Sequence, residues 1–400
     1  MVDERAVSRI EEIRAEIARG IGTVERLTEH SLWSRTGPAL FSGAKLSATP
    51  SFYPVYRWRD TYAWSVLPLV VLKGTLTTNP RAVAAARAPG FIYFGSNETI
   101  DRDIERVGGP LVRADQRDIV TPDSYAREMT NALCADLAEV ESLAGDAQQF
   151  ILVGGRDSLN LLLVPWRRPP VALSAAPNFS LVADFVRRNG LAIEVRELTD
   201  PEEPDVLSCE VLENGCRANL EHYRWGACLR AIAREHEGAV FWKGQLGDVV
   251  MTPFWKKYCH PRGGRRELVQ KVYARTDRLL PAPLRRAIGD YALVPLLLDA
   301  LWRRGAMWQG HHMSVLRALT NRRFLSAYHG PRVQALLRRV DFVRAASEDI
   351  RPRIGALLLG REVTYPSTNP GPTPSHFRRG LAAPERYFDA LRAGGISVVG

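Results

Sequence analysis

The spacing of apolar residues predicts a helix at the start of the chain and short mixed elements after it. Four apolar residues recur at helical spacing before about residue 20, on one face of that helix: Ala6, Ile10, Ile13 and Ile17. Between residues 30 and 120 glycine, proline and aromatic residues become frequent, and three runs have the composition of strands: 67–72, 91–94 and 111–113. We therefore expect residues 1–120 to form a small mixed α/β domain.

From residue 121 the pattern alternates between helices and strands. Thr121 is a suitable N-cap and Pro122 suits the first helical position, so an apolar stripe over 125–143 predicts a helix. The elements predicted next are strand 149–153, helix 157–163, strand 170–175, helix 180–189, strand 191–198, helix 218–235 and strand 239–243. This order favours a parallel sheet with helices on both faces, which binds ligands at the carboxyl ends of its strands.

The remainder of the chain predicts mostly helix. Residues 264–345 have helical patterning, and a loop rich in proline and glycine follows over 360–374, with a short helix around 384–391. The predicted domain organisation is therefore an N-terminal domain over 1–120, a sheet domain with a helical C-terminal part over 121–345, and a loop and tail over 346–400 that close the site.

Composition and charge narrow the class of protein. With 400 residues, 46% hydrophobic and 24% charged, the chain can build two or three globular cores, which excludes a disordered, collagenous or disulfide-stapled protein. The formal net charge is +10, and 48 of the 54 basic residues are arginines. Because these arginines are scattered rather than clustered, a polyanionic small molecule such as ATP suits the charge better than nucleic acid does.

The spacing of the cysteines and the lengths of the apolar runs indicate the cellular compartment of the protein. The five cysteines include no C-x2-C pair, which is typical of free thiols in a reducing environment. The first residues are charged, unlike a signal peptide, and the longest apolar runs are too short to span a bilayer. We expect a cytoplasmic protein without a membrane partner.

The first motif with chemical content follows the predicted strand 149–153. The apolar strand runs into Gly154 and Gly155, and Asp157 and Ser158 then open a helix. Glycines let the backbone approach an anion closely, and free N–H groups at a helix start point at phosphate. Ser158 can add one donor, and the carboxylate of Asp157 can hold Mg²⁺.

A second motif follows the predicted strand 239–243, about 90 residues further along the chain. Gly244 and Gln245 begin a glycine-containing turn that ends in Asp248. Both motifs stand at carboxyl ends of predicted parallel strands, so we expect them to face one site.

The two motifs together resemble those of a known family. Residues 153–158 are similar to the S-G-G-x-D-S pyrophosphate loop of the N-type ATP pyrophosphatases, and 243–249 to the S-G-E-G-A-D-E turn of the asparagine synthetase synthetase domain. The resemblance covers residues 120–260 and implies an α/β fold: a parallel-sheet ATP pyrophosphatase (adenine nucleotide α hydrolase-like) domain with ATP and Mg²⁺ as cofactors. It implies that Mg²⁺ is held by Asp157 and Asp248, and that ATP is bound by Val153, Gly154, Gly155, Asp157, Ser158, Gly244 and Gln245.

The resemblance also implies an activity. The asparagine synthetase-like group, which includes β-lactam synthetases and lasso peptide cyclases, converts a carboxylate to an acyl-adenylate with release of pyrophosphate, and an amine or ammonia then attacks. We therefore expect an AMP-forming, ATP-dependent ligase that makes an amide bond in natural-product or peptide tailoring, with a small-molecule or peptide carboxylate and an amine as substrates.

The sequence departs from the family pattern at several positions. Val2 stands where the glutaminase half needs its cysteine nucleophile, so residues 30–120 are interpreted as a reduced glutaminase-like remnant. Val153 replaces the first serine of the pyrophosphate loop, and Gln245 replaces an acid of the second turn. The family's C-terminal lysine is absent, because no lysine follows position 271; Arg361 and Lys257 are the candidates to supply that charge.

Two alternatives remain open. The basic charge suits a tRNA-modifying ATP pyrophosphatase, whereas the absence of a C-x2-C pair and of a compact basic block argues against it. The altered motif positions also suit a degenerate member that binds nucleotide without catalysis.

Overall fold

The computed structural model describes residues 4–34, 38–46, 55–86, 99–107, 117–199, 225–245, 247–253, 323–366 and 384–400. Several predictions fall outside these residues: the strands 91–94 and 111–113, the first part of the helix 218–235, the helical region up to 322, and Lys257.

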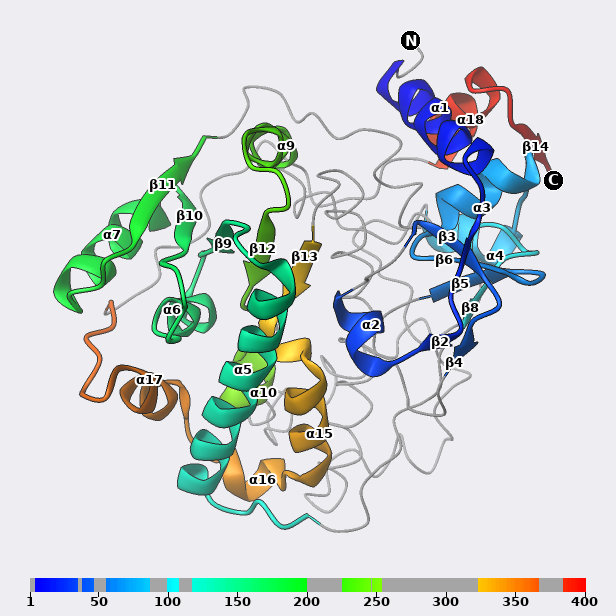
Figure 1. Cartoon of the computed structure of the whole chain (residues 1–400). Helices are drawn as coiled ribbons and strands as arrows, with labels where there is room; N and C mark the ends of the chain where they lie inside the picture. The colour runs from blue at the N-terminus through cyan, green and yellow to red at the C-terminus, as the bar shows by residue number, and fades with distance from the viewer. Residues whose placement is uncertain are drawn as a thin grey trace.

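A parallel five-stranded sheet organises the larger part of the described structure (Figure 1). Its order is β11-β10-β9-β12-β13, with bounds β9 (Gln149–Leu152), β10 (Val171–Ala175), β11 (Glu194–Leu198), β12 (Val240–Lys243) and β13 (Arg323–Ser326). The chain runs outward from β9 to β11 and then returns to the other side of β9 with β12. The order therefore reverses between β9 and β12, and ligands of such sheets bind at that reversal.

The parallel sheet and its first four strands agree with the sequence prediction, and the fifth strand does not. β13 lies within the region expected to be helical. Its four residues are too few for an alternation of apolar and polar positions to be visible in the sequence.

Both faces of this sheet are buried. Alternate residues point to opposite faces, so Ile151, Val240 and Trp242 join one core cluster whereas Phe150 and Phe241 join another. The first face packs against α5 (Pro122–Ala144), α6 (Arg156–Leu162) and α7 (Asn178–Arg188), and the second against α9 (Gly226–Glu235). The helix start predicted at Thr121 is confirmed, because its hydroxyl accepts a hydrogen bond from the Ser124 N–H at 3.2 Å.

Shorter helices complete the first face. They are α10 (Gly247–Met251), the 3₁₀ turn η4 (Ala327–His329), α15 (Pro331–Arg339), α16 (Phe342–Ala345) and α17 (Arg351–Leu359). Helix α17 falls in the segment expected to be loop and tail, and it packs against α5 and α6.

The N-terminal residues form a second sheet of order β1-β3-β6-β5-β8, which is antiparallel except for its β1–β3 pair. The strands are β1 (Gly22–Thr23), β3 (Leu40–Ser42), β5 (Val55–Trp58), β6 (Thr61–Ala63) and β8 (Glu105–Val107). Around it lie α1 (Glu4–Ala18), α2 (Glu29–Ser34), α3 (Val66–Lys73), α4 (Pro80–Ala86) and the short parallel pair β2 (Arg26–Leu27) and β4 (Lys45–Leu46). The mixed α/β character expected for this part is present.

The prediction of a strand over 67–72 is wrong, because this segment is the buried helix α3. Its apolar residues are buried on all sides, so no helical periodicity marks it in the sequence. Gly74 ends the helix with a positive φ of 72°, and its N–H bonds the carbonyl of Val70 at 2.9 Å.

The last helix and strand of the chain lie in the N-terminal part, whereas residues 367–383 of the expected loop and tail are outside the described structure, so the closing of the site by this segment stays a prediction. Helix α18 (Pro384–Ala393) packs against α1, and β14 (Ser397–Val399) pairs in parallel with β7 (Thr75–Thr77) in the N-terminal part, where Figure 1 shows both chain ends. Tyr387 and Leu391 are buried in that core. The apolar face of α18 is thus satisfied there rather than over the central sheet.

The boundary near residue 120 is also less sharp than expected. Trp33 of α2 packs on Trp242 of the central sheet with ring centroids 5.8 Å apart, and its indole N–H donates to the Ser326 carbonyl at 3.1 Å. The N-terminal part therefore contributes to the core beneath β12 and β13. None of the helices in the described ranges combines the length and apolarity needed to cross a bilayer.

Candidate functional site

A cavity of about 350 Å³ opens at the carboxyl ends of the central strands. The cavity is lined by residues from β9, β10, β11 and β12, from the segments that follow β9 and β12, and from the residue before α9: Leu152, Val153, Gly154, Gly155, Asp157, Ser158, Leu173, Ser174, Ala175, Leu198, Trp225, Lys243, Gly244 and Gln245. Its position coincides with the reversal of strand order between β9 and β12. The volume lies in the range of small-molecule sites.

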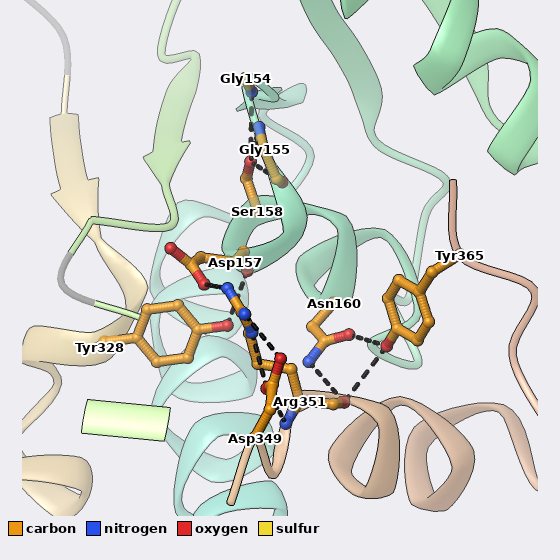
Figure 2. Close-up of polar contacts among 9 residues, drawn as sticks. All are labelled: Gly154, Gly155, Asp157, Ser158, Asn160, Tyr328, Asp349, Arg351 and Tyr365. Atoms are coloured by element: carbon orange, nitrogen blue, oxygen red, sulfur yellow. Dashed lines mark hydrogen bonds and ion pairs between the residues drawn. The ribbon is translucent and has the colours of Figure 1, made fainter. Parts of the chain in front are cut away.

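The two motifs found in the sequence meet in this lining. The Ser158 hydroxyl oxygen accepts hydrogen bonds from the N–H groups of Gly154 at 3.2 Å and Gly155 at 3.4 Å (Figure 2). Its own proton is donated to the Gly155 carbonyl at 2.9 Å. Two backbone amides thus converge on the Ser158 hydroxyl oxygen, and a phosphate oxygen that replaced this hydroxyl would receive both hydrogen bonds.

The second motif packs directly against the first. A Cβ placed on Gly244 would lie 2.6 Å from the Ser158 nitrogen, so only glycine permits this approach. A Cβ on Gly247 would similarly lie 2.5 Å from the Asp157 Cβ. The expected meeting of Gly154, Gly155, Asp157 and Ser158 with Gly244 and Gln245 is therefore what the structure has, and α10, which carries Asp248, adjoins Asp157.

Asp157 is engaged by an arginine. Arg351 Nη1 donates to the Asp157 carboxylate at 2.8 Å, and the second arginine nitrogen, Nη2, donates to Asp349 at 2.6 Å (Figure 2). Burial alone would lower the pKa of Arg351, but its hydrogen bonds and charge interactions with Asp349 and Asp157 raise it. The Tyr328 hydroxyl holds the same turn through the Asp157 carbonyl at 2.7 Å.

This ion pair bears on the expected Mg²⁺ ligands. Mg²⁺ is held by one or two carboxylates in most nucleotide sites, and Asp157 is the acidic side chain among the lining residues. Its charge is already compensated by Arg351, and the described residues contain no group of three acidic, histidine or cysteine side chains that could hold a metal ion. The Asp248 side chain lies outside the described residues, so the assignment of Mg²⁺ to Asp157 and Asp248 stays a prediction.

Lys243 lines the cavity as well, and no motif in the sequence marks it as a site residue. In β12, Phe241 and Lys243 point to the α9 face because side chains alternate, and that face holds the cavity. Burial lowers the pKa of Lys243 to about 7. The available sequence signal was its place as the last residue of a predicted strand, immediately before a glycine turn.

Two amide oxygens at this site have no hydrogen-bond partner among the described residues. Asn178 Nδ2 donates to the Gly154 carbonyl at 3.0 Å, which leaves its Oδ1 unpaired, and Gln245 Oε1 is likewise unpaired. Both oxygens are buried, so a ligand that donates hydrogen bonds, such as a ribose hydroxyl or an amine, would satisfy them.

The opposite part of the lining is apolar. Leu173, Ala175, Leu198 and Trp225 supply it, with Trp225 placed just before α9. Apolar walls with a few polar groups are typical of sites for ligands that carry a ring. The sequence marked none of these side chains as functional, because core residues of β10 and β11 look the same in sequence.

Arg361 is not brought to the cavity. Its guanidinium donates to the Asn189 carbonyl at 2.7 Å, at the end of α7 opposite to Asn178. The 11 residues of α7 separate these ends by about 16 Å. Asn189 also exchanges hydrogen bonds with Thr364 at 3.0 and 3.1 Å, so this segment is anchored on α7. Lys257 lies outside the described residues.

A comparison of the sequence with protein-family models and with curated proteins gives no match to either.

Proposed function

We propose that this chain binds ATP in the cavity at the carboxyl ends of the central strands and uses it to join a carboxylate to an amine or ammonia. The observation that carries the proposal is the loop over 154–158: two amides converge on one oxygen, at the reversal of strand order, beside a cavity of about 350 Å³. The resemblance of both motifs to the asparagine synthetase-like group supports the same conclusion. In this proposal residues 121–345 form an ATP pyrophosphatase domain.

The proposed reaction has two steps. A carboxylate oxygen of the substrate attacks the α-phosphorus of ATP, the bond to pyrophosphate breaks, and an acyl-adenylate forms. The amine nitrogen then attacks the acyl carbon, AMP leaves, and the amine gives up one proton as the amide forms. The site's contribution is to stabilise negative charge on the phosphates. Lys243 lines the cavity, and the amides of Gly154 and Gly155 can donate to a phosphate oxygen when it takes the place of the Ser158 hydroxyl.

The function can be tested by thermal unfolding with ATP. Ligand at 100 times its Kd adds about 2.7 kcal/mol to the free energy of unfolding. For a chain of 400 residues this raises Tm by about 3 °C. A screen of carboxylates with hydroxylamine as the amine should then find AMP formation that depends on one carboxylate class. No rise in Tm, or AMP formation independent of any carboxylate, would contradict the proposal.

The same measurement decides the place of Mg²⁺, which stays a prediction. If Asp157 is committed to Arg351, ATP should raise Tm equally with Mg²⁺ and with EDTA, and Asp157→Asn should retain the rise. If Asp157 and Asp248 hold Mg²⁺, the rise should need Mg²⁺ and vanish in Asp157→Asn.

A second candidate function is nucleotide binding without catalysis. The specific observation in its favour is the Arg351–Asp157 pair, which occupies the carboxylate that the family uses for the metal. A rise in Tm with ATP but no AMP formation with any carboxylate would favour this candidate.

A further inference from the structure

We propose that Arg351 is a positioning residue of this site: through Asp157 it holds the start of α6, and with it the amides of Gly154 and Gly155. This role rests on the proposed function, in which these amides receive phosphate. Arg351 is the first residue of α17, 194 residues after Asp157, and belongs to neither sequence motif. It is not one of the residues that line the cavity, so it acts on a ligand through Asp157, which is.

A second carboxylate aims the Arg351 side chain at Asp157. Asp349 accepts hydrogen bonds from the Arg351 backbone N–H at 3.1 Å, from Nε at 2.8 Å and from Nη2 at 2.6 Å. The remaining nitrogen, Nη1, donates to the Asp157 carboxylate at 2.8 Å (Figure 2). Because a guanidinium presents its donors in a rigid fork, fixing Nε and Nη2 on Asp349 also fixes the direction of Nη1.

The main chain of Arg351 holds the same turn of α6 at a second point. Its carbonyl accepts a hydrogen bond from Asn160 Nδ2 at 3.1 Å, and Asn160 is fully buried. The Tyr365 hydroxyl donates to the other amide atom, Asn160 Oδ1 (Figure 2). Asn160 follows Asp157 by three residues, so the two side chains lie on one face of α6. Arg351 therefore contacts the first turn of this helix with both its side chain and its main chain.

The first turn of α6 depends on such contacts. The helix has seven residues, too few to be stable without packing partners. The Arg351 side chain is 15% exposed and that of Asp157 is 22% exposed, so solvent screens this ion pair less than a surface pair. Asp157 is followed directly by Ser158, whose hydroxyl accepts the N–H groups of Gly154 and Gly155. A displacement of Asp157 therefore also moves the amides.

The first experiment is hydrogen exchange of the full chain without nucleotide, measured by mass spectrometry on peptides that cover residues 154–162. Arg351→Met keeps a similar length and removes the donors, so this segment should exchange at least about tenfold faster than in wild type. The segment 171–175 of β10 is the internal reference and should stay within about twofold of wild type. Unchanged exchange of 154–162 would overturn the proposal.

The route through Asp157 is tested by a double-variant cycle. Asp157→Ala removes the acceptor, so Arg351→Met introduced into that background should change the exchange of residues 154–162 by less than about twofold. An effect as large as in the wild-type background would show that Arg351 acts on the loop by another path, such as the packing of α17. That result would overturn the proposal.

Two further variants separate this role from the stability of α17. Arg353 lies on the same helix and pairs with Asp123 and Glu348, so Arg353→Met should leave the exchange of residues 154–162 unchanged. Arg351→Lys keeps the charge but replaces the fork with a single ammonium, and exchange should be about threefold faster than in wild type. If Arg351→Met does not fold, this lysine variant carries the test, and exchange equal to wild type would count against the proposal.

Isothermal titration with ATP then measures what the positioning does for the ligand. Arg351→Met should bind ATP about tenfold more weakly than wild type, and Arg351→Lys should recover part of this loss. Equal ATP affinity of wild type and Arg351→Met, with faster exchange, would overturn the role in ligand binding and leave the proposed function standing. Absence of ATP binding by wild type, with exchange coupled as expected, would overturn the proposed function and leave Arg351 as a residue that holds the loop.

Discussion

Replacing Asp136 with alanine should lower the free energy of unfolding by about 2–4 kcal/mol. Asp136 lies on α5 with none of its side chain exposed, and its carboxylate accepts the N–H groups of Arg332 at 3.0 Å and Val333 at 3.1 Å. These are orphan donors in the first turn of α15, which alanine would leave unpaired in the interior. Denaturant unfolding at pH 7 measures the loss, and a loss below about 1 kcal/mol would contradict this account.

Asp136→Asn is the matched control, because it keeps an acceptor and cannot ionise. Burial raises the pKa of Asp136 to about 6, against hydrogen bonds from Val333 and Arg332 that lower it. A folded-state pKa above the ordinary 3.8 means that the stability from this group is present below pH 3.8 and lost as pH rises through 6. Relative to wild type, Asp136→Asn should therefore gain up to about 3 kcal/mol between pH 4 and pH 7. A constant difference over this range would show that the carboxyl does not titrate with a raised pKa.

The central sheet could be predicted because two kinds of signal agreed. Apolar strands alternated with helices at short spacing, and caps such as Thr121 and Pro122 marked a helix start. The helix α3 and the strand β13 lacked such signals. The first is apolar on every side, and the second is four residues long, so burial and strand pairing decide their structure rather than local pattern.

The residues of the candidate site likewise fall into those that a local sequence signal marks and those that it does not. Gly154, Gly155, Asp157, Ser158, Gly244 and Gln245 could be named from sequence because strand-end glycines and their neighbours form recognisable short motifs. The side chains that contact these motif residues come from distant parts of the sequence. Arg351 lies 194 residues after Asp157, so no local sequence pattern predicts their ion pair. Charge and loop position predict Arg361 as a site residue, whereas in the structure its guanidinium donates to the Asn189 carbonyl at the end of α7.

Replacing Gly244 with alanine should cost both stability and ligand binding, and it is the sharpest test of how the two motifs are joined. The added Cβ would lie 2.6 Å from the nitrogen and 2.7 Å from the Cα of Ser158, and 2.8 Å from the carbonyl carbon of Asp157. All three are backbone atoms, so no side chain can rotate away, and the loop itself must move. We expect a loss of about 1–3 kcal/mol of stability and about 100-fold weaker ATP binding, because a shift near 1 Å misaligns the amides.

Gly154→Ala provides the matched control from the same cavity. A Cβ on Gly154 meets nothing within 4 Å, so the variant should unfold within about 0.5 kcal/mol of wild type. Its methyl group would nevertheless stand beside the amide that is proposed to receive phosphate, so ATP affinity should fall while stability does not. If Gly244→Ala binds ATP like wild type, the contact between the two motifs is not what shapes the site. If Gly154→Ala does so, phosphate does not approach this amide. Together the two variants separate the packing that holds the loop in place from the contacts that the loop offers to a ligand.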